Sequence, residues 1–368
     1  MKVLVYTMLS VLLVVGFSAC GEDDNDGGSV DNFDREAMLT SWVDNFILPA
    51  YSEFTTASTA LTAAATTFET TPDQASFDAV RAAFVDTYRK WQKISLYQIG
   101  QAEALGLREQ VNAFPTDVAG IEANISDSNF NLALPSQRDR QGFPALDYLL
   151  YGTAADAAAI LDRFVNEPAM RAYLVDVASR IEVLTKDVEQ AWLGTYRGEF
   201  ISNSGSGATA SVDRFVNDFI FYYEKWLRAG KVGIPAGVFS SQPQPGRVEA
   251  RYNGELARTL TLDALATAQD FFNGNGANGP TAFGFADYLA SLNTTRDGAD
   301  LGQLINDQLN VARTAIQGLD QDFEAQVTND NISMLGAYDE LQKVVVLIKV
   351  DMVQAFNVAI DFVDADGD

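Results

Sequence analysis

The feature that most constrains this fold is a stripe of apolar side chains repeated at alternating spacings of four and three residues. The clearest stripe comprises Met170, Leu174, Val177, Ile181, Leu184, Val188 and Ala191. Such spacing places apolar groups on one face of an α-helix, as in an antiparallel helical bundle. A second stripe runs from Tyr338 to Ala359. We therefore expect both to form core and not the lining of a cofactor channel.

Further helix signals occur throughout the chain from Asp34 onward. We expect helices over roughly residues 34–69, 72–99, 142–152, 168–191, 212–231, 250–272, 280–292, 297–318 and 334–362. Pro49 should kink the first of these, because proline lacks the N–H of a helical hydrogen bond. Gly230 should end the helix that begins near Val212, with Arg228 and Lys231 as cations at its negative end.

Two helical domains are predicted from these signals. No stretch alternates convincingly with the period of two that indicates a strand, so the fold class is all-α, with two packed helical bundles. Residues 202–210, Ser-Asn-Ser-Gly-Ser-Gly-Ala-Thr-Ala, have the composition of a linker. The boundaries follow as a bundle over 33–201, a linker over 202–210 and a second bundle over 211–368.

The amino terminus has the pattern of an export signal. Lys2 precedes an apolar run that is too short to span a bilayer, and small residues precede Cys20, the single cysteine of the chain. We interpret residues 1–19 as a signal peptide and residues 20–32 as a lipidated cysteine with an acidic tether. The location expected is the outer membrane of a Gram-negative bacterium, on its periplasmic face or at the cell surface. An ordinary signal peptide with a chance cysteine is the alternative.

The charge and the missing histidines exclude several functions. A formal charge of −25 argues against binding nucleic acid, and against contact with a membrane other than through a lipid anchor. The chain contains no histidine, which rules out Ser-His-Asp catalysis, histidine-ligated zinc and haem held by an imidazole. An oxygen-coordinated metal ion remains an open possibility as a cofactor.

Residues 142–152 combine a helix start with polar groups. Pro144 suits the first helical position, and Asp147 lies one turn later, near the positive end of the helix. The apolar residues of the segment share one face and are expected to be buried: Phe143, Leu146, Leu149 and Leu150. Asp147 and Tyr148 are then left on the flank, where a cleft could use them. A capped core helix with no further role is the alternative.

The same segment resembles the Gly-x-His-x-x-Glu signature of the imelysin-like family, cell-envelope proteins related to insulin-cleaving peptidases and iron-regulated proteins. Here Gly142 matches the glycine, Pro144 stands in the histidine position and Asp147 stands in the glutamate position. Further segments in the family's order are Leu48-Pro49-Ala50-Tyr51, Trp91, Asn112 to Asp117, Lys231 to Pro235 and Gly284 to Leu289. The resemblance implies two four-helix-bundle-like domains with a cleft between them, lined by the signature.

An internal echo supports the predicted duplication. Gly284-Phe285 and Asp287-Tyr288-Leu289 resemble Gly142-Phe143 and Asp147-Tyr148-Leu149 and occupy a similar place in the second half of the chain. The candidate cleft and ligand-binding residues are Asn112, Asp117, Asp147, Tyr148, Arg228, Lys231 and Asp287. Asp117 and Asp287 could join Asp147 across a cleft, although solvated acids at helix starts are more common.

Three functions are compatible with these features. The first is a non-catalytic binding lipoprotein that holds a small ligand, glycan, peptide or iron species for uptake, with an outer-membrane transporter as partner. The second is an imelysin-type metallopeptidase with oxygen ligands, which the family resemblance implies but which the loss of the histidine weakens. The third is a surface assembly protein that binds no small ligand. The acidic end, Asp364 to Asp368, begins like a calcium loop but stops too early to complete one.

Overall fold

Helices make up almost all regular structure in the computed structural model, which describes residues 33–277, 279 and 282–362. Within these residues one two-stranded antiparallel sheet occurs, formed by β1 (Thr295–Arg296) and β2 (Ala299–Asp300). The all-α prediction is confirmed. The predicted signal peptide, Cys20, the tether and the acidic end at Asp364 to Asp368 lie outside the described residues.

The first long helix changes its geometry close to Pro49, where a kink was expected. It runs through α1 (Arg35–Trp42), the π-helical η1 (Val43–Ile47) and α2 (Leu48–Thr70). The wider turns of η1 come directly before Pro49, since proline cannot donate the N–H that an α-helical turn needs there.

The next helix, α3 (Gln74–Ile94), begins with a capping box in which the side chains of Asp73 and Ser76 each accept a hydrogen bond from the other's backbone N–H. It ends five residues before the predicted Ile99, and residues 97–99 lie outside any helix.

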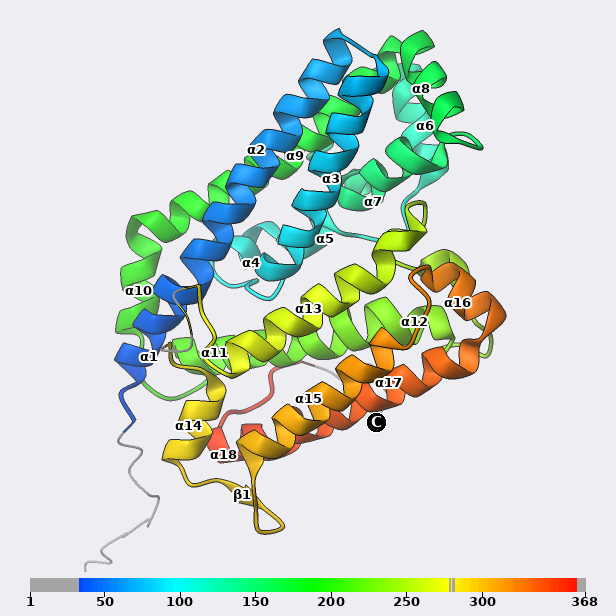
Figure 1. Ribbon diagram of the computed structural model, residues 1–368. Helices are drawn as coiled ribbons and strands as arrows, with labels where there is room; N and C mark the ends of the chain where they lie inside the picture. The colour runs from blue at the N-terminus through cyan, green and yellow to red at the C-terminus, as the bar shows by residue number, and fades with distance from the viewer. Residues whose placement is uncertain (1–32, 278, 280–281, 363–368) are drawn as a thin grey trace, which may run out of the picture. The chain divides into compact units, whose positions relative to one another are not determined.

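The stripe at residues 170–191 is confirmed as core. It belongs to α9 (Pro168–Ala191), whose members Met170, Leu174 and Val177 are fully buried. In Figure 1, α2, α3 and α9 lie side by side at the top of the view, and α9 and α3 both contact α2. After α9 come η4 (Trp192–Tyr196) and α10 (Arg197–Ser202), with a kink at Gly194, whose ψ of −136° is not helical.

Short helices connect α3 with α9 and carry the signature segment. They are α4 (Gln101–Leu105), α5 (Leu107–Val111), α6 (Val118–Asp127), η2 (Pro135–Arg140), α7 (Gly142–Asp147), η3 (Tyr148–Gly152) and α8 (Ala157–Asn166). Helix α7 contacts both α9 and α5, so the signature segment is attached to the first group of helices.

The second half of the chain forms another set of packed helices. They are α11 (Ser211–Phe221), η5 (Tyr222–Gly233), α12 (Ile234–Ala236), η6 (Pro245–Arg247), η7 (Gly254–Leu256), α13 (Ala257–Phe272), α14 (Phe285–Ser291), α15 (Leu301–Gln317), α16 (Phe323–Asn329), α17 (Asn331–Val346), η8 (Leu347–Met352) and α18 (Val353–Phe356). Helix α15 contacts α13 and α17, and η5 contacts α17 (Figure 1). Because α13 also contacts α3, the two sets of helices pack against each other.

The predicted helix end at Gly230 is wrong. The helix continues as η5 and α12 to Ala236, and Gly237 ends it with a left-handed φ of 82°. A glycine inside a helix costs only about 1 kcal/mol, which burial of the surrounding side chains outweighs. Arg228 and Lys231 are therefore interior residues, 0% and 4% exposed, and not cations at a solvated helix end.

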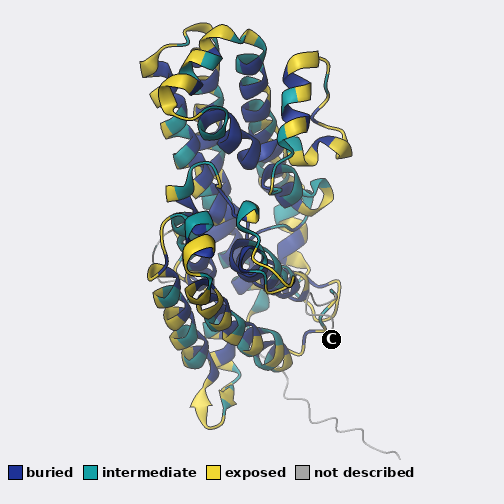
Figure 2. Ribbon diagram, turned by 90° about the vertical axis from the view of Figure 1, so that its right-hand side faces the viewer, coloured by how far each residue is buried: buried dark blue, intermediate teal, exposed yellow. Residues whose placement is uncertain are grey.

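Buried residues occupy the helix faces that are turned toward neighbouring helices, and exposed residues cover the outward faces (Figure 2). Aromatic rings join elements that are distant in sequence: Trp42 of α1 lies 5.0 Å from Phe215 of α11 and 5.4 Å from Phe285 of α14, measured between ring centroids. Across the described part of the chain, every helix is too short or too polar to cross a lipid bilayer.

Candidate functional site

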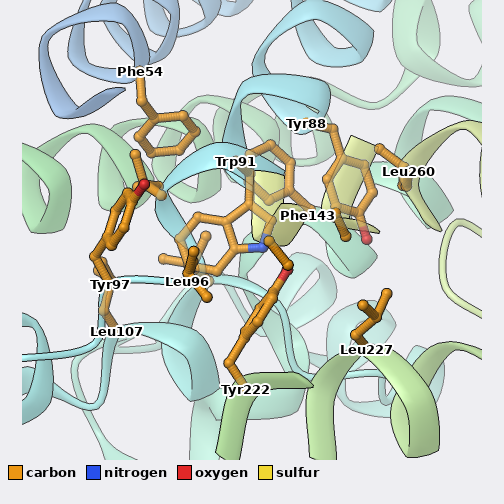
Figure 3. Packing of buried hydrophobic residues seen from close by; sticks show 14 of the residues in the cluster. Phe54, Tyr88, Trp91, Leu96, Tyr97, Leu107, Phe143, Tyr222, Leu227 and Leu260 are labelled. Carbon is orange, nitrogen blue, oxygen red and sulfur yellow. The ribbon is translucent and has the colours of Figure 1, made fainter. Parts of the chain in front are cut away.

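The signature segment begins at a glycine that no other residue could replace without strain. Gly142 has a φ of 75°, and a Cβ atom built on it would lie 2.1 Å from the backbone oxygen of Val111. This close approach fixes α7 against α5. The next residue, Phe143, stacks on the ring of Tyr88 with centroids 4.3 Å apart and also neighbours Trp91, as Figure 3 shows.

Asp147, in the glutamate position of the signature, is buried and bound to backbone. One carboxylate oxygen accepts a hydrogen bond from the N–H of Tyr252 at 2.8 Å, and the other accepts one from Asn253 at 2.9 Å. Asp147 is only 1% exposed, so the expectation that its side chain lies on the accessible flank of the helix was wrong. Burial raises the pKa of Asp147 to about 7, although the two N–H donors oppose the rise.

A buried polar cluster surrounds Glu249, three residues before Tyr252 in the chain. Lys231 donates to Glu249 and, at 2.9 Å, to the side-chain oxygen of Gln92. Asn112 donates to Glu249 at 2.7 Å and accepts from the Tyr88 hydroxyl at 2.7 Å. We call these five residues the Lys231 cluster.

The Lys231 cluster and Asp147 together hold one connecting segment, residues 248–254, against both halves of the chain. The carboxylate of Glu249 accepts hydrogen bonds from three side chains. They belong to Gln92 of α3, Asn112 after α5 and Lys231 of η5. Three residues after Glu249 the backbone is fixed by Asp147 of α7. Buried charges are costly unless they are paired and hydrogen-bonded; Lys231 and Glu249 pair with each other, whereas Asp147 has only backbone N–H donors as partners. This buried polar network therefore holds together parts of the chain that are far apart in sequence.

A small pocket opens beside the signature segment. Its volume is about 110 Å³, and residues that line it include Phe114, Thr116, Val118, Pro144, Asp147 and Val248. Pro144 therefore puts an apolar ring where the family signature has an imidazole. The pocket lies between segments that precede and follow residues 202–210. A water molecule occupies about 30 Å³ of liquid, so the pocket suits a small group and not a large ligand.

The structure brings together three of the residues predicted from sequence, Asn112, Asp147 and Lys231, around residues 248–254. Tyr148 lies next to Asp147, where its hydroxyl donates to Glu122 at 2.5 Å and its ring packs edge-on against Tyr252. Burial and its bond to Glu122 raise the pKa of Tyr148 to about 12.

The other three predicted residues serve elsewhere. Asp117 caps α6 and forms an ion pair with Arg140 at 2.9 Å. Arg228 donates to the Tyr338 hydroxyl at 2.7 Å and to Gln342, away from the signature. Asp287 accepts from the N–H of Gly284 at 2.9 Å and so caps α14.

Three members of the Lys231 cluster, Tyr88, Gln92 and Glu249, were not predicted as site residues from the sequence. Gln92 gave a usable signal, because it lies in the buried surface of α3 beside Trp91 and four residues after Tyr88, where a polar side chain needs a partner. Glu249 gave almost none, since it follows a Gly/Pro-rich loop and its partners come from distant elements.

The residues around the signature do not fit a hydrolytic metal ion. Such an ion needs several ligands and an open position for water. Both oxygens of Asp147 already accept backbone hydrogen bonds, and Pro144 offers no donor atom. In the part of the chain that the structure describes, no three Asp, Glu, Cys or His side chains gather closely enough to hold a metal ion.

Comparisons with known proteins place these features in a family context. A family model described as Imelysin, of the M75 peptidases, matches residues 47–348. Iron-regulated protein A from Synechococcus elongatus is 25% identical over 154 residues, which are 40% of this chain and 38% of that protein. The chain thus matches well under half the length of this curated relative.

Two solved structures share the fold. An imelysin-like protein from Psychrobacter arcticum superposes with a TM-score of 0.70 at 16% identity, over 89% of this chain and 97% of its own. A structure described as an iron-regulated protein A precursor from Parabacteroides distasonis gives a TM-score of 0.70 at 17% identity, over 86% of this chain and 95% of its own.

Proposed function

This chain belongs to the imelysin family, and we propose that it is a non-catalytic binding protein of the cell envelope that holds a small ligand in the pocket beside Pro144. The observation that carries the proposal is the set of hydrogen bonds made by the carboxylate of Asp147. Asp147 uses both oxygens to hold the backbone of Tyr252 and Asn253, while the pocket next to it remains open.

Binding is favoured over peptide cleavage because the site lacks the groups that hydrolysis needs. A general base must reach the attacking water, and a metal needs several free ligands. Pro144 supplies neither, and Asp147 is engaged by backbone. Apolar side chains, among them Phe114, Val118 and Pro144, line the pocket together with polar groups such as Asp147, and small-molecule sites combine the two kinds of group in this way.

The proposed setting is an outer-membrane lipoprotein in an uptake system. The predicted lipidation of Cys20 motivates the location, and the name iron-regulated protein A of one relative motivates an iron species as the first ligand to test. A glycan end or a short peptide are the other candidates, with an outer-membrane transporter as the partner that would receive the ligand.

Filling the pocket is expected to abolish ligand-induced stabilisation. Val118 lines the pocket, and Val118→Trp would place an indole in it. Val165 is 45% exposed on α8 and does not line the pocket, so Val165→Trp is the matched control. The measurement is the thermal unfolding midpoint of each protein with ferric citrate, haemin, maltohexaose or tetra-alanine, because a ligand that binds only the folded state raises it.

We expect at least one of these probes to raise the midpoint of the wild type and of Val165→Trp in a saturable manner, with the rise lost in Val118→Trp. The proposal fails if every probe leaves the wild type unchanged, or if the rise is the same in Val118→Trp.

A further inference from the structure

A larger pocket lies away from the signature segment, between the start of α2, the turn after α3 and the end of α13. Its volume is about 220 Å³. One wall is apolar and consists of Phe46, Pro49 and Ala50. None of the residues that line it belongs to the Lys231 cluster or to the pocket beside Pro144.

Tyr97 lines this pocket, and its hydroxyl is a polar group on the wall. The residue is only 2% exposed, yet its hydroxyl makes no hydrogen bond to any residue that the structure describes. A hydroxyl that reaches a pocket without a bond to the protein is available there to water or to a polar group of a ligand. Burial raises the pKa of Tyr97, and the charge of Asp270 contributes to the rise, which is consistent with the two side chains being close.

One carboxylate of the pocket, that of Asp270, takes part in no ion pair among the described residues. Glu53 is paired with Lys93 at 2.8 Å, so these two charges cancel. Asp270 forms no ion pair within the described ranges of the chain, and its carboxylate has only a marginal contact, 3.5 Å long, with the side-chain amide of Asn275. Asp270 is exposed at the edge of the pocket, and partial desolvation raises the pKa of its carboxyl, although its bond to Asn275 and the charges of Arg313 and Lys93 oppose the rise.

We propose that this pocket binds a small organic cation. Its protonated amino group would donate to the carboxylate of Asp270 and to the hydroxyl oxygen of Tyr97, and its apolar body would lie against Phe46, Pro49 and Ala50. Hydrogen bonds from a cation to a carboxylate are about twice as strong as neutral ones, which gives the acid a direct role in selecting charge. The net charge of −25 also favours the approach of cations over anions.

Three probes of similar size and different charge test the proposal by isothermal titration calorimetry on the full chain. They are benzylamine, benzyl alcohol and benzoate. We expect saturable binding of benzylamine, weaker binding of benzyl alcohol and none of benzoate. Asp270→Asn should weaken benzylamine binding about tenfold, and Tyr97→Phe about threefold. Tyr97→Phe removes a hydroxyl that bonds to no described residue, so it should not lower the thermal midpoint of the free protein.

Asp339→Asn is the control, since Asp339 is exposed on α17 and its loss changes the net charge by the same amount as Asp270→Asn. Benzylamine affinity should change less than twofold in this variant. The proposal is wrong if benzylamine does not bind, or if benzoate also binds. It is equally wrong if Asp270→Asn and Asp339→Asn weaken benzylamine binding by the same factor. None of these outcomes bears on the pocket beside Pro144.

Discussion

Replacing Lys231 with methionine is expected to lower the free energy of unfolding by about 3–5 kcal/mol. Lys231 is 4% exposed and Glu249 is 2% exposed. Methionine fills a similar volume, but it leaves the Glu249 carboxylate buried without its cation. The same change removes the hydrogen bond to Gln92. Urea denaturation at neutral pH measures the loss.

Two comparisons separate this effect from a general loss of charge. In the double variant Lys231→Met with Glu249→Gln, the buried charge is gone, so we expect a substantial part of the lost stability to return. Lys186→Met removes an exposed lysine that pairs with Glu182 one turn away, and it should cost less than about 1 kcal/mol. If Lys231→Met lowers the free energy of unfolding no more than Lys186→Met does, the Lys231 cluster does not stabilise the contact between the two halves of the chain.

Titration of Asp147 should make the folded protein less stable as the pH rises. A carboxyl with a pKa near 3.9 in the unfolded chain and about 7 in the folded protein binds more protons when folded across this interval. The stability it contributes is therefore complete below about pH 4 and is lost as the pH rises to 7. From pH 4.5 to 8 the loss amounts to about 3 kcal/mol, as an order of magnitude.

The variant Asp147→Asn isolates this contribution. Its free energy of unfolding should vary less steeply between pH 4.5 and pH 8 than that of the wild type. The pH dependence is compared, not the offset, because an amide alters the bonds to Tyr252 and Asn253 at every pH. Asp339→Asn, at an exposed site, should keep the wild-type slope. Parallel curves for the wild type and Asp147→Asn would show that Asp147 titrates at an ordinary pH.

The sequence predicted the elements of the fold better than their ends. The stripe in α9 and the start of that helix at Pro168 are local patterns, and the structure confirms them. Gly230 is a typical helix stop, but tertiary burial carries the helix past it to Gly237. Local propensities of about 1 kcal/mol are easily overridden in this way.

The site could be predicted only in part, because its parts meet through tertiary contacts. Asn112 and Lys231 were identified from family-like segments, yet what joins them is Glu249, which carries no local signal. Arg228 was selected as a cation at a helix end and proved to serve another buried cluster. The division into bundles at residues 202–210 stays a prediction.

Elemental analysis of the full chain, purified without added metal, tests the central claim most directly. That claim is that Asp147 fastens the backbone of Tyr252 and Asn253 and is not a ligand of a catalytic metal. We predict that the wild type and Asp147→Asn carry the same metal content, below one ion per chain. One bound metal ion per wild-type chain that is lost in Asp147→Asn would contradict the account.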